Sequence, residues 1–487
     1  MKRSINQYCD WAMSVSENHS LLTVDSSQDQ PLYRQIYLRF QGAIADGLLK
    51  PGGRIPSARA LAKELGLARG TVETAYALLA AEGYVQPRGQ AGTIVTPGLA
   101  ASQTMAVKPA PASARHGEKF GWHPPTVLPF QLGLPALDAF PRKIWARLGA
   151  RHLRAMQAVE MAYPPVQGLY GLRQAIAAYL QMARGITCAP EQVFITSGYR
   201  DTLHLIAEAL LREGDQAWVE DPGYPPTRKL LGQMGIELVP VPVDDDGLVV
   251  SRGMQTAPDA RAVVVTPAHQ SPLCLSLSLP RRLALLEWAR QKKSWIIEDD
   301  YDGEYRYASR PLPALKSLDR HGRVLYAGTF SKVMFPGIRV GYLVVPESQV
   351  ERFGRTREVF SAGVPELGQA ILASFMNEGH FARHIHRMRK LYAERRTAVA
   401  EGLGQVLDAA GMHIQPQPGG MHLVLRLGGR QSDKALNALM REHGMFAEAL
   451  SGWATQAEVQ PGLLLSFTNI ESQHQAQQLG KRILALL

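Results

Sequence analysis

The segment YAGTFSKVMFPGIRVGY, residues 326–342, holds one lysine in a setting where it could do chemistry. Lys332 follows the hydroxyl residues Thr329 and Ser331, and Arg339 comes shortly after it. A lysine amine can bond covalently to a carbonyl compound, and hydroxyl groups beside an arginine can hold a phosphate group. The segment therefore indicates either a covalent site for a phosphorylated carbonyl compound or an ordinary solvated lysine.

The segment VFITSGYRDTLHLIAEALL, residues 193–211, passes from a strand pattern into a helical one. The backbone amides near Ser197, Gly198 and Tyr199 should therefore lie at a helix N-terminus, where phosphate binds readily. A Ser-Gly pair before a helix also serves as a simple cap, so this segment leaves both roles open.

A third segment, SWIIEDDYDGEYRY at residues 294–307, ends an apolar run with acids. A carboxylate at the end of a buried strand is costly unless it meets a cation, and Asp299 would meet one in a protonated pyridine nitrogen. Tyr301 could then bond a hydroxyl group of that ring, and Tyr199 could stack on its face. Taken alone, the segment also fits an acidic loop or a metal site.

Alternating elements must hold these three segments in place. Over residues 127–487, helical patterns alternate with short β-branched runs: VFITSG, AWVE, AVVVTP, SWIIEDD, VLYAGT and GYLVV. This rhythm predicts a large α/β domain with a mostly parallel sheet.

The first part of the chain has a different pattern, with three short helices and a hairpin over residues 31–96. Ser57 is placed to cap the second helix, ARALAKELG, and Gly66 ends it. The third helix, ARGTVETAYALLAAEG, follows after one short turn, as in a helix-turn-helix. The apolar side of the first helix is expected to comprise Ile36, Phe40, Ile44 and Leu48.

Polar residues of this module could contact DNA. The third helix begins with Arg69 and Thr71, and YVQPRGQAGTIV would form a wing that presents Arg88 and the backbone near Gly89. Residues 31–100 hold eight Lys/Arg against four Asp/Glu, a surplus of +4. Because that surplus is modest, a small three-helix domain with exposed arginines is the alternative.

The whole chain sets further bounds. Its 487 residues predict at least two domains, and its net charge of +10 fits a polyanionic partner. No apolar run is long enough to span a membrane, and no apolar stretch follows the basic start, so we expect no membrane helix and no secretory signal. Cys9, Cys188 and Cys274 are too few and too scattered for a disulfide framework or a zinc site, so we expect a cytoplasmic protein without a metal.

Composition places the domain boundaries. Residues 1–30 have no clear periodicity and form an extension, and residues 97–126 are rich in Pro, Ala, Ser and Gly, as in a linker. The two predicted domains are therefore 31–96 and 127–487.

Residues 31–95, from PLYRQIYLRF to QAGTIV, resemble a GntR-type winged helix-turn-helix over its full length. The resemblance implies DNA contacts from the arginine after the Pro-Ser pair, from the start of the third helix and from the wing glycine. These positions are Arg59, Arg69, Thr71 and Gly89, with Arg54, Ser57 and Arg88 as further candidates.

The large domain resembles the aminotransferases of fold type I, which use pyridoxal 5'-phosphate (PLP). The resemblance lies in YPPVQGLYGLRQAIAAYL, VEDPGYPPTRKLL, VVVTPAHQSP, WIIEDDYDGEYRY and GTFSKVMFPGIRVGYLVVP, in this order. It implies that Lys332 forms the internal aldimine and that Asp299 pairs with the ring nitrogen. Tyr301 would lie near the ring hydroxyl, with His269 or Gln270 where aminotransferases use an asparagine. The remaining candidate cofactor contacts are Ser197, Gly198, Tyr199, Thr329, Ser331 and Arg339.

A GntR-type module joined to such a domain resembles the MocR or GabR-type transcription regulators. The resemblance implies a head-to-tail homodimer in which each DNA-binding module lies against the large domain of the partner. A ligand at the PLP site, either an amino compound or PLP itself, would change how the two modules meet promoter DNA.

Two departures separate this chain from an ordinary aminotransferase. In GLLLSF, Leu464 stands where many aminotransferases hold the substrate carboxylate with an arginine, a contact worth roughly 1.5–3 kcal/mol. Arg426 or Arg200 could replace it. In SPLCLS, Cys274 stands where a glycine is usual.

We therefore predict a PLP-dependent transcription regulator without sustained transamination. The alternatives are a true aminotransferase with an appended DNA-binding module, and a DNA-binding protein whose large domain serves only for dimerisation.

Overall fold

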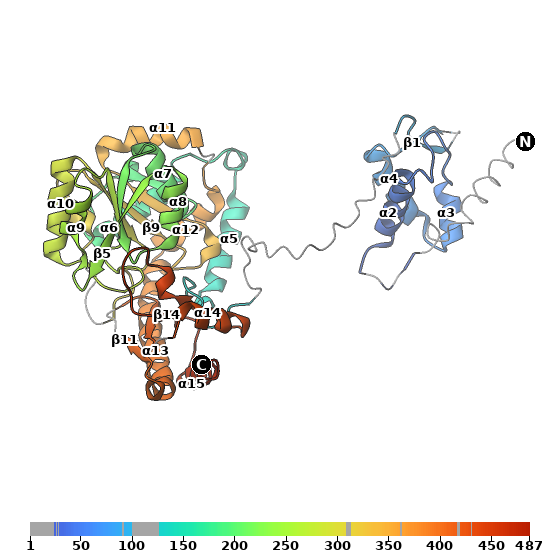
Figure 1. Cartoon of the computed structure of the whole chain (residues 1–487). Helices are drawn as coiled ribbons and strands as arrows, with labels where there is room; N and C mark the ends of the chain where they lie inside the picture. The colour runs from blue at the N-terminus through green and yellow to red at the C-terminus, as the bar shows by residue number, and fades with distance from the viewer. Residues whose placement is uncertain are drawn as a thin grey trace, which may run out of the picture. The chain divides into compact units, whose positions relative to one another are not determined.

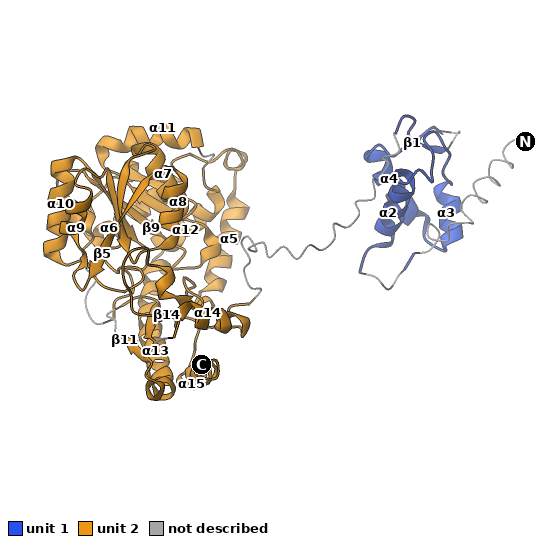
Figure 2. Ribbon diagram, viewed as in Figure 1, with its two compact units in different colours: residues 1–122 blue, residues 123–487 orange. Residues whose placement is uncertain are grey.

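The computed structural model describes residues 24–25, 27, 29–89, 92–99, 126–307, 313–360, 363–415, 419–429 and 431–487. The chain divides into two compact units, Met1–Trp122 and His123–Leu487 (Figure 2). The predicted extension at 1–30 and the predicted linker at 97–126 lie mostly outside the described residues. No helix of the described residues is long and apolar enough to cross a membrane.

The first unit is a three-helix module with a two-stranded wing (Figure 1). Its elements are α2 (Leu32–Ala45), α3 (Ala58–Leu65), α4 (Arg69–Ala81), β1 (Val85–Pro87) and β2 (Thr93–Val95). The two strands pair in antiparallel register, with Val85 opposite Val95. Leu61, Val72 and Leu79 are fully buried and join α3 and α4 in one small core.

The predicted helix ends of this unit are confirmed at two positions and wrong at one. The Ser57 side chain accepts a hydrogen bond from the Ala60 amide at 3.2 Å, and Gly66 ends α3 with a φ of 66°, which glycine adopts without strain. The expected apolar side of the first helix fails at Leu48, because α2 stops at Ala45 and Leu48 is 52% exposed. Leu49 is buried in its place.

The second unit is built on an eight-stranded sheet in the order β3-β10-β9-β8-β7-β4-β5-β6. Strands β5, β4, β7, β8 and β9 run parallel, and β3, β10 and β6 enter by antiparallel pairs. All six predicted strands are present. The strands are β3 (Val193–Thr196), β4 (Gln216–Asp221), β5 (Glu237–Asp244), β6 (Gly247–Leu248), β7 (Ala262–Val265), β8 (Trp295–Asp300), β9 (Val324–Thr329) and β10 (Gly341–Val344).

Helices cover both faces of this sheet (Figure 1). Successive residues of β8 enter different cores, because Trp295 and Ile297 belong to one buried cluster and Ile296 to another. The helices are α5 (Arg142–Ala155), α6 (Tyr170–Arg184), α7 (Tyr199–Leu210), α8 (Pro225–Gln233), α9 (Val250–Thr256), α10 (Leu279–Lys292), α11 (Val350–Phe360) and α12 (Glu366–Asn377).

A smaller antiparallel sheet, in the order β11-β12-β14-β13, follows the long helix α13 (His380–Leu407). Asp221, at the end of β4, joins this part to the large sheet. Its carboxylate accepts hydrogen bonds from the backbone amides of Thr455, Gln456 and Ala457 at 2.7–2.8 Å. The remaining elements are β11 (His413–Gln415), β12 (His422–Arg426), α14 (Asp433–Glu442), β13 (Glu448–Ala449), β14 (Gly462–Ser466) and α15 (Gln473–Leu484).

Candidate functional site

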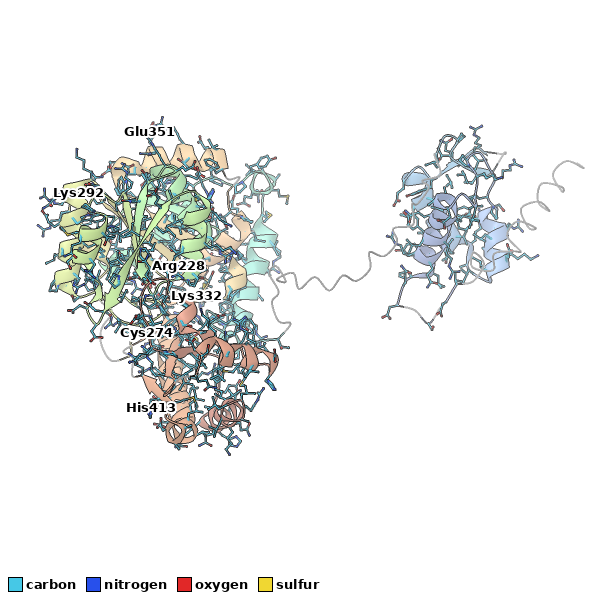
Figure 3. The ribbon with its side chains drawn as sticks, viewed as in Figure 1. Arg228, Cys274, Lys292, Lys332, Glu351 and His413 are labelled. Carbon is cyan, nitrogen blue, oxygen red and sulfur yellow. The ribbon has the colours of Figure 1, made fainter. Side chains whose placement is uncertain are left out.

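Lys332 lies in the loop that follows β9, inside the second unit (Figure 3). Its Nζ donates a hydrogen bond to the carbonyl oxygen of Gly133 at 3.1 Å. Gly133 has a φ of 77°, and a Cβ there would lie 2.2 Å from that Nζ. Burial lowers the pKa of Lys332, and the carboxylates of Asp302 and Asp299 oppose this only in part. A lysine with a lowered pKa is more often neutral and nucleophilic.

Asp299 lies near the end of β8, next to the strand that leads to Lys332. Its side chain is buried, and the described residues give its carboxylate neither a hydrogen bond nor an ion pair. Burial and the nearby acids Asp300 and Glu220 raise its pKa well above the ordinary value, whereas Lys332 lowers it. A buried carboxyl group without a partner is the acceptor that a protonated ring nitrogen needs.

Gly198 and Arg339 form a candidate anion cradle at the start of α7. A Cβ built on Gly198 would lie 3.6–3.7 Å from the Arg339 guanidinium, and Gly198 has a φ of 118°, which strains other residues. The Ser197 amide donates to Asp201 Oδ2 at 2.7 Å, so it is already used. The amides of Gly198 and Tyr199 have no partner among the described residues, and they begin the helix.

The hydroxyl residues before Lys332 are half-buried. Thr329 Oγ1 accepts the amide of Ser331 at 3.2 Å, which fixes the turn after β9. Asp201, the partner of the Ser197 amide, also pairs with Arg357 at 2.9 Å, which holds the start of α7 against α11.

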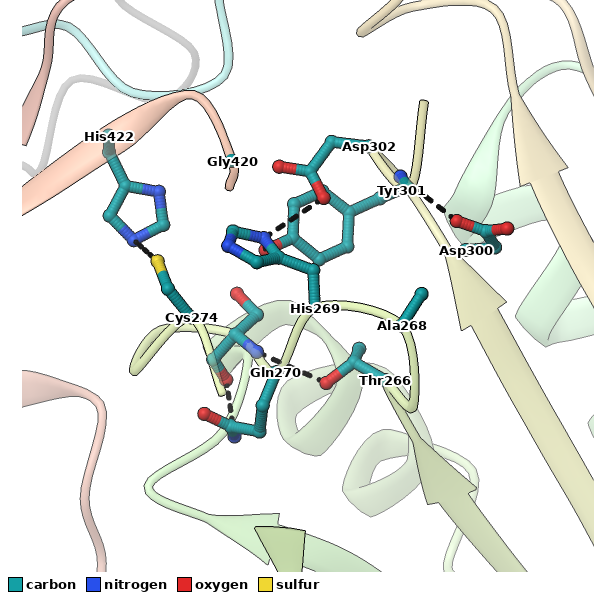
Figure 4. A network of polar contacts seen from close by, with 12 residues as sticks. Thr266, Ala268, His269, Gln270, Cys274, Asp300, Tyr301, Asp302, Gly420 and His422 are labelled. Carbon is teal, nitrogen blue, oxygen red and sulfur yellow. Dashed lines mark hydrogen bonds and ion pairs between the residues drawn. The ribbon is translucent and has the colours of Figure 1, made fainter. Parts of the chain in front are cut away.

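Tyr301 and His269 belong to one polar network (Figure 4). His269 Nδ1 is 3.0 Å from Tyr301 Oη and 3.1 Å from Asp302 Oδ1, and both the histidine and the aspartate are buried. Sequence reasoning did not single out Asp302, although it stands in the same acidic segment. Ser271 was also missed; it adjoins Gln270, and its hydrogen bond lowers the pKa of Tyr301 against the effect of burial.

Gln270 and Tyr199 are held by other protein groups. Gln270 Nε2 donates to the carbonyl oxygens of Pro222 and Ser271 at 2.9 Å, so its amide supports the loop. Tyr199 Oη lies 2.7 Å from Thr227 Oγ1, and burial raises the pKa of Tyr199, with the charge of Asp299 adding to the effect.

Leu464, on β14, is fully buried in a small apolar cluster. The described members of this cluster are Val424, Leu450, Leu464, Leu132, Leu273 and Trp453. Leu132 directly precedes Gly133, whose carbonyl oxygen accepts the hydrogen bond from Lys332, so this cluster reaches the backbone beside the lysine amine. Arg426 donates hydrogen bonds to Gln415 and to the carbonyl oxygen of Gln460. Arg200 is exposed on α7, where its charge lowers the pKa of Tyr224 against burial.

The first unit exposes its candidate DNA-contacting residues. The exposed residues are Arg54, Ser57, Arg59, Arg69, Arg88 and Gly89, and Thr71 is half-buried. Arg69 Nε lies 2.7 Å from Glu73 Oε1, one turn further along α4. Gly89 has a φ of 53°, and the Arg88 amide donates to the carbonyl of Gly92 at 2.7 Å, which closes the turn of the wing.

Both units match known protein families. Residues 32–95 match the bacterial regulatory proteins of the gntR family, and residues 136–457 match aminotransferase class I and II. The chain therefore belongs to the MocR-type transcription regulators, in which a GntR helix-turn-helix precedes an aminotransferase-like domain. The predicted regulator is confirmed over the alternative of an aminotransferase with an appended module.

Curated relatives share this organisation. The chain is 37% identical to the probable rhizopine catabolism regulatory protein MocR of Rhizobium meliloti, over 93% of each chain. It is 34% identical to the pyridoxine biosynthesis transcriptional regulator PdxR of Corynebacterium glutamicum, over 89% of this chain and 91% of that protein. It is 35% identical to the transcriptional regulator TauR of Rhodobacter capsulatus, over 83% of this chain and 86% of that one.

Solved aminotransferase structures share the fold of the second unit. The α-aminoadipate aminotransferase LysN of Thermus thermophilus, solved with N-(5'-phosphopyridoxyl)-L-leucine, superposes with a TM-score of 0.66 at 26% identity. This covers 74% of this chain and 94% of LysN. The kynurenine aminotransferase of Pyrococcus horikoshii gives a TM-score of 0.66 at 25% identity, over 74% of this chain and 91% of that enzyme.

Proposed function

We propose that this regulator binds PLP at Lys332 and that a ligand at the same site changes its binding to promoter DNA. The observation that carries the proposal is the buried carboxyl group of Asp299, which has no cationic partner among the described residues and adjoins a lysine with a lowered pKa. The residues therefore fit PLP. That cofactor supplies an aldehyde that bonds reversibly to amines and a ring nitrogen that carries a proton.

Each candidate residue has a separate task in this proposal. Lys332 provides the amine, and Asp299 holds the proton on the ring nitrogen. Tyr301 donates to the ring oxygen with His269 behind it, whereas Gln270 supports the loop. The phosphate is held by Arg339 and by the free amides of Gly198 and Tyr199, with the hydroxyl groups of Thr329 and Ser331 beside them and Ser197 completing the turn.

The apolar cluster around Leu464 favours an effector without a carboxylate on that side. A carboxylate placed against Leu132 and Leu273, the partly buried leucines of this cluster, would lose its water without gaining a charged partner. Simple amines and PLP itself therefore fit better than α-amino acids. The same feature argues against sustained transamination of amino acids.

The first unit would bind one half-site of promoter DNA. Its contacts would come from Arg59, Arg69 and Thr71, with the wing residues Arg88 and Gly89 at the adjacent groove and Arg54 and Ser57 at the backbone. The GntR match and the exposure of six of these seven positions support this role. A cytoplasmic location follows, because the DNA is there.

Exposed apolar residues support a homodimer. Two segments of the second unit carry them, and Gly363 brings the segments together, because a Cβ there would lie 3.1 Å from Pro164. The exposed side chains are Val159, Met161, Tyr163, Val359 and Phe360. Tyr163 is 92% exposed, and such a patch is typical of an interface. Tyr163→Asp with Val359→Asp should yield monomers in sedimentation, whereas Met182→Asp, at another exposed apolar position, should not. A dimer that survives the double change would exclude this interface.

The PLP claim has a direct test. The purified chain should show a visible absorbance band that Lys332→Ala abolishes and Lys292→Ala leaves intact, since Lys292 is an exposed lysine paired with Asp259. If the wild type with added PLP shows no such band, the cofactor claim is wrong. Bound PLP should also change promoter affinity and its salt dependence; if it does not, the second unit serves only for dimerisation.

The effector class can be tested by pairs of ligands. A panel would pair each amine with its α-carboxylated counterpart. Within each pair, the amine should shift the visible band at a lower concentration than the carboxylated compound. Steady conversion of amino acids to keto acids at ordinary enzyme rates would contradict the proposal that this regulator does not sustain transamination.

A further inference from the structure

Cys274 occupies an unusual position in the loop between β7 and α10. Its side chain is fully buried, and its φ of 62° lies in the left-handed region that favours glycine. Cys274 therefore carries a side chain at a backbone conformation that favours glycine. Figure 4 shows that its sulfur points toward His422 on one side and that His269 lies beside it.

His422 Nε2 must carry a hydrogen. It lies 2.9 Å from the carbonyl oxygen of Pro272, which can only accept, and 3.2 Å from Cys274 Sγ. The carbonyl oxygen and the sulfur therefore share this one N–H, and a thiolate is a stronger acceptor than a thiol. A thiol could instead donate weakly to Pro272, whose oxygen is 3.6 Å from the sulfur.

His269 Nδ1 has two neighbours that can accept a hydrogen bond. It lies 3.1 Å from Asp302 Oδ1, an acceptor when ionised, and 3.0 Å from Tyr301 Oη. Its Nε2 is buried and has no hydrogen-bond partner among the described residues. Gly420 packs against that edge of the ring, because a Cβ there would lie 2.5 Å from Nε2.

We propose that Cys274 is a positioning residue of the cofactor site, a thiolate that serves as counter-charge to His269. A charged His269 carries a hydrogen on both ring nitrogens, so its Nδ1 donates toward Tyr301 and Asp302, and the Tyr301 hydroxyl has its own hydrogen free for the ring oxygen of PLP. A neutral ring has only one hydrogen, and with that hydrogen on Nε2 its Nδ1 would instead accept from Tyr301. The proposal rests on the proposed PLP binding.

The surrounding charges agree with this arrangement. Although burial opposes ionisation, His269 and His422 lower the pKa of the Cys274 thiol to about 6. Against the same effect of burial, Asp302 and Cys274 raise the pKa of His269 well above its ordinary value. The other titratable groups around the cluster are Tyr301, Tyr307, Asp299 and Lys332. Among the described residues, no group of three His, Cys, Asp or Glu is placed to hold a metal ion.

The first measurement uses the full-length chain freed of PLP and needs no cofactor. Thiolate absorbance in the ultraviolet should titrate near pH 6 in the wild type, and this component should be absent from Cys274→Ser, whose hydroxyl group does not ionise. Cys188 serves as an internal reference, because burial raises its pKa. A Cys274 component that titrates only at or above the ordinary thiol pKa overturns the proposal.

The second measurement follows the visible band of bound PLP against pH. Cys274→Gly suits the backbone conformation, so the variant should fold. Without the hydrogen bond from Tyr301, the ring oxygen of PLP becomes more basic. The pH at which the visible band is half changed should therefore rise by about one to two pH units. Tyr301→Phe should raise it likewise, and Cys274→Gly in the Tyr301→Phe background should add nothing.

The outcomes separate the two proposals. A visible band whose midpoint Cys274→Gly leaves unchanged overturns only the role of Cys274. An equal shift in the Tyr301→Phe background also overturns it, because the sulfur would then act without the tyrosine. A wild type that lacks the band overturns PLP binding as well.

Discussion

Arg184 Nε lies 2.8 Å from Asp300 Oδ2, and both side chains are almost completely buried. Arg184 also pairs with Glu304 at 3.0 Å, and the Tyr326 hydroxyl donates to the same Asp300 oxygen at 2.6 Å. This network ties the end of α6 to β8 and β9. Asp299 is the neighbour of Asp300, so the same bonds determine where the candidate ring-nitrogen partner stands.

Arg184→Ala should lower the free energy of unfolding of the second unit by about 3–5 kcal/mol, because it leaves two buried carboxylates without their cation. Urea denaturation would measure the loss. Lys292→Ala removes an exposed pair with Asp259 and should cost far less, because water screens that pair. Equal losses in the two variants would mean that the buried pair contributes nothing beyond a surface contact.

Gly133→Ala should weaken PLP binding by about tenfold or more. Its new Cβ would lie 2.2 Å from Lys332 Nζ, and its φ of 77° adds backbone strain of about 1–2 kcal/mol. Titration of the chain with PLP would measure this. Gly232→Ala, on α8, meets no atom within 4 Å and should bind PLP like the wild type. Normal binding by Gly133→Ala would place the amine elsewhere.

Asp299→Asn should have opposite effects on PLP binding and on the stability of the chain without PLP. It removes the partner of the ring nitrogen, so PLP should bind more weakly. It also removes a carboxyl group whose ionised form burial disfavours, so the chain without PLP should become more stable at neutral pH. Isothermal titration and urea denaturation would measure the two quantities.

The stability difference between wild type and Asp299→Asn should depend on pH. Burial raises the pKa of Asp299 well above 3.8, so the folded chain binds this proton more tightly than the unfolded chain. The wild type therefore loses stability relative to the variant as the pH rises above 3.8, until the pH passes the raised pKa. A difference that is constant across pH would mean that Asp299 is not perturbed.

Arg69→Ala should weaken promoter binding by about 1–3 kcal/mol if the guanidinium contacts a guanine edge. If it contacts phosphate instead, binding to all sequences should weaken, and the slope of affinity against salt should fall by about one. Binding measured over a salt series on promoter and unrelated DNA distinguishes the two. Arg34→Ala provides a control on α2, since Arg34 lies over the ring of Tyr37. An equal loss in both variants would show only a general effect of charge.

Local chemistry explains how much of this could be predicted from the sequence. The cap at Ser57 and the left-handed glycine at Gly66 depend on a few neighbouring residues, so their types were enough. Lys332 and Asp299 could be associated because each follows a β-branched run, and the two runs became the adjacent parallel strands β9 and β8.

Contacts between distant segments could not be predicted in this way. Nothing near Gly133 indicates that its carbonyl receives the lysine amine, and the role of Gln270 in its loop depends on Pro222, far away in the chain. Cys274 stood out by its type, but its positive φ and its contact with His422 required the fold. The prediction that Leu48 lies on the apolar side of the first helix is wrong because α2 ends at Ala45.

The three hydrogen bonds that Asp221 accepts from backbone amides limit how a bound ligand can act. If the small sheet swung away from the large sheet, a buried carboxylate would lose all three donors together, at a cost of several hydrogen bonds to a charged group. Movement of the small sheet relative to the large sheet is therefore an unfavourable response to a ligand in this unit. A ligand bound beside Lys332, as proposed, would therefore have to act through side-chain rearrangements within this unit.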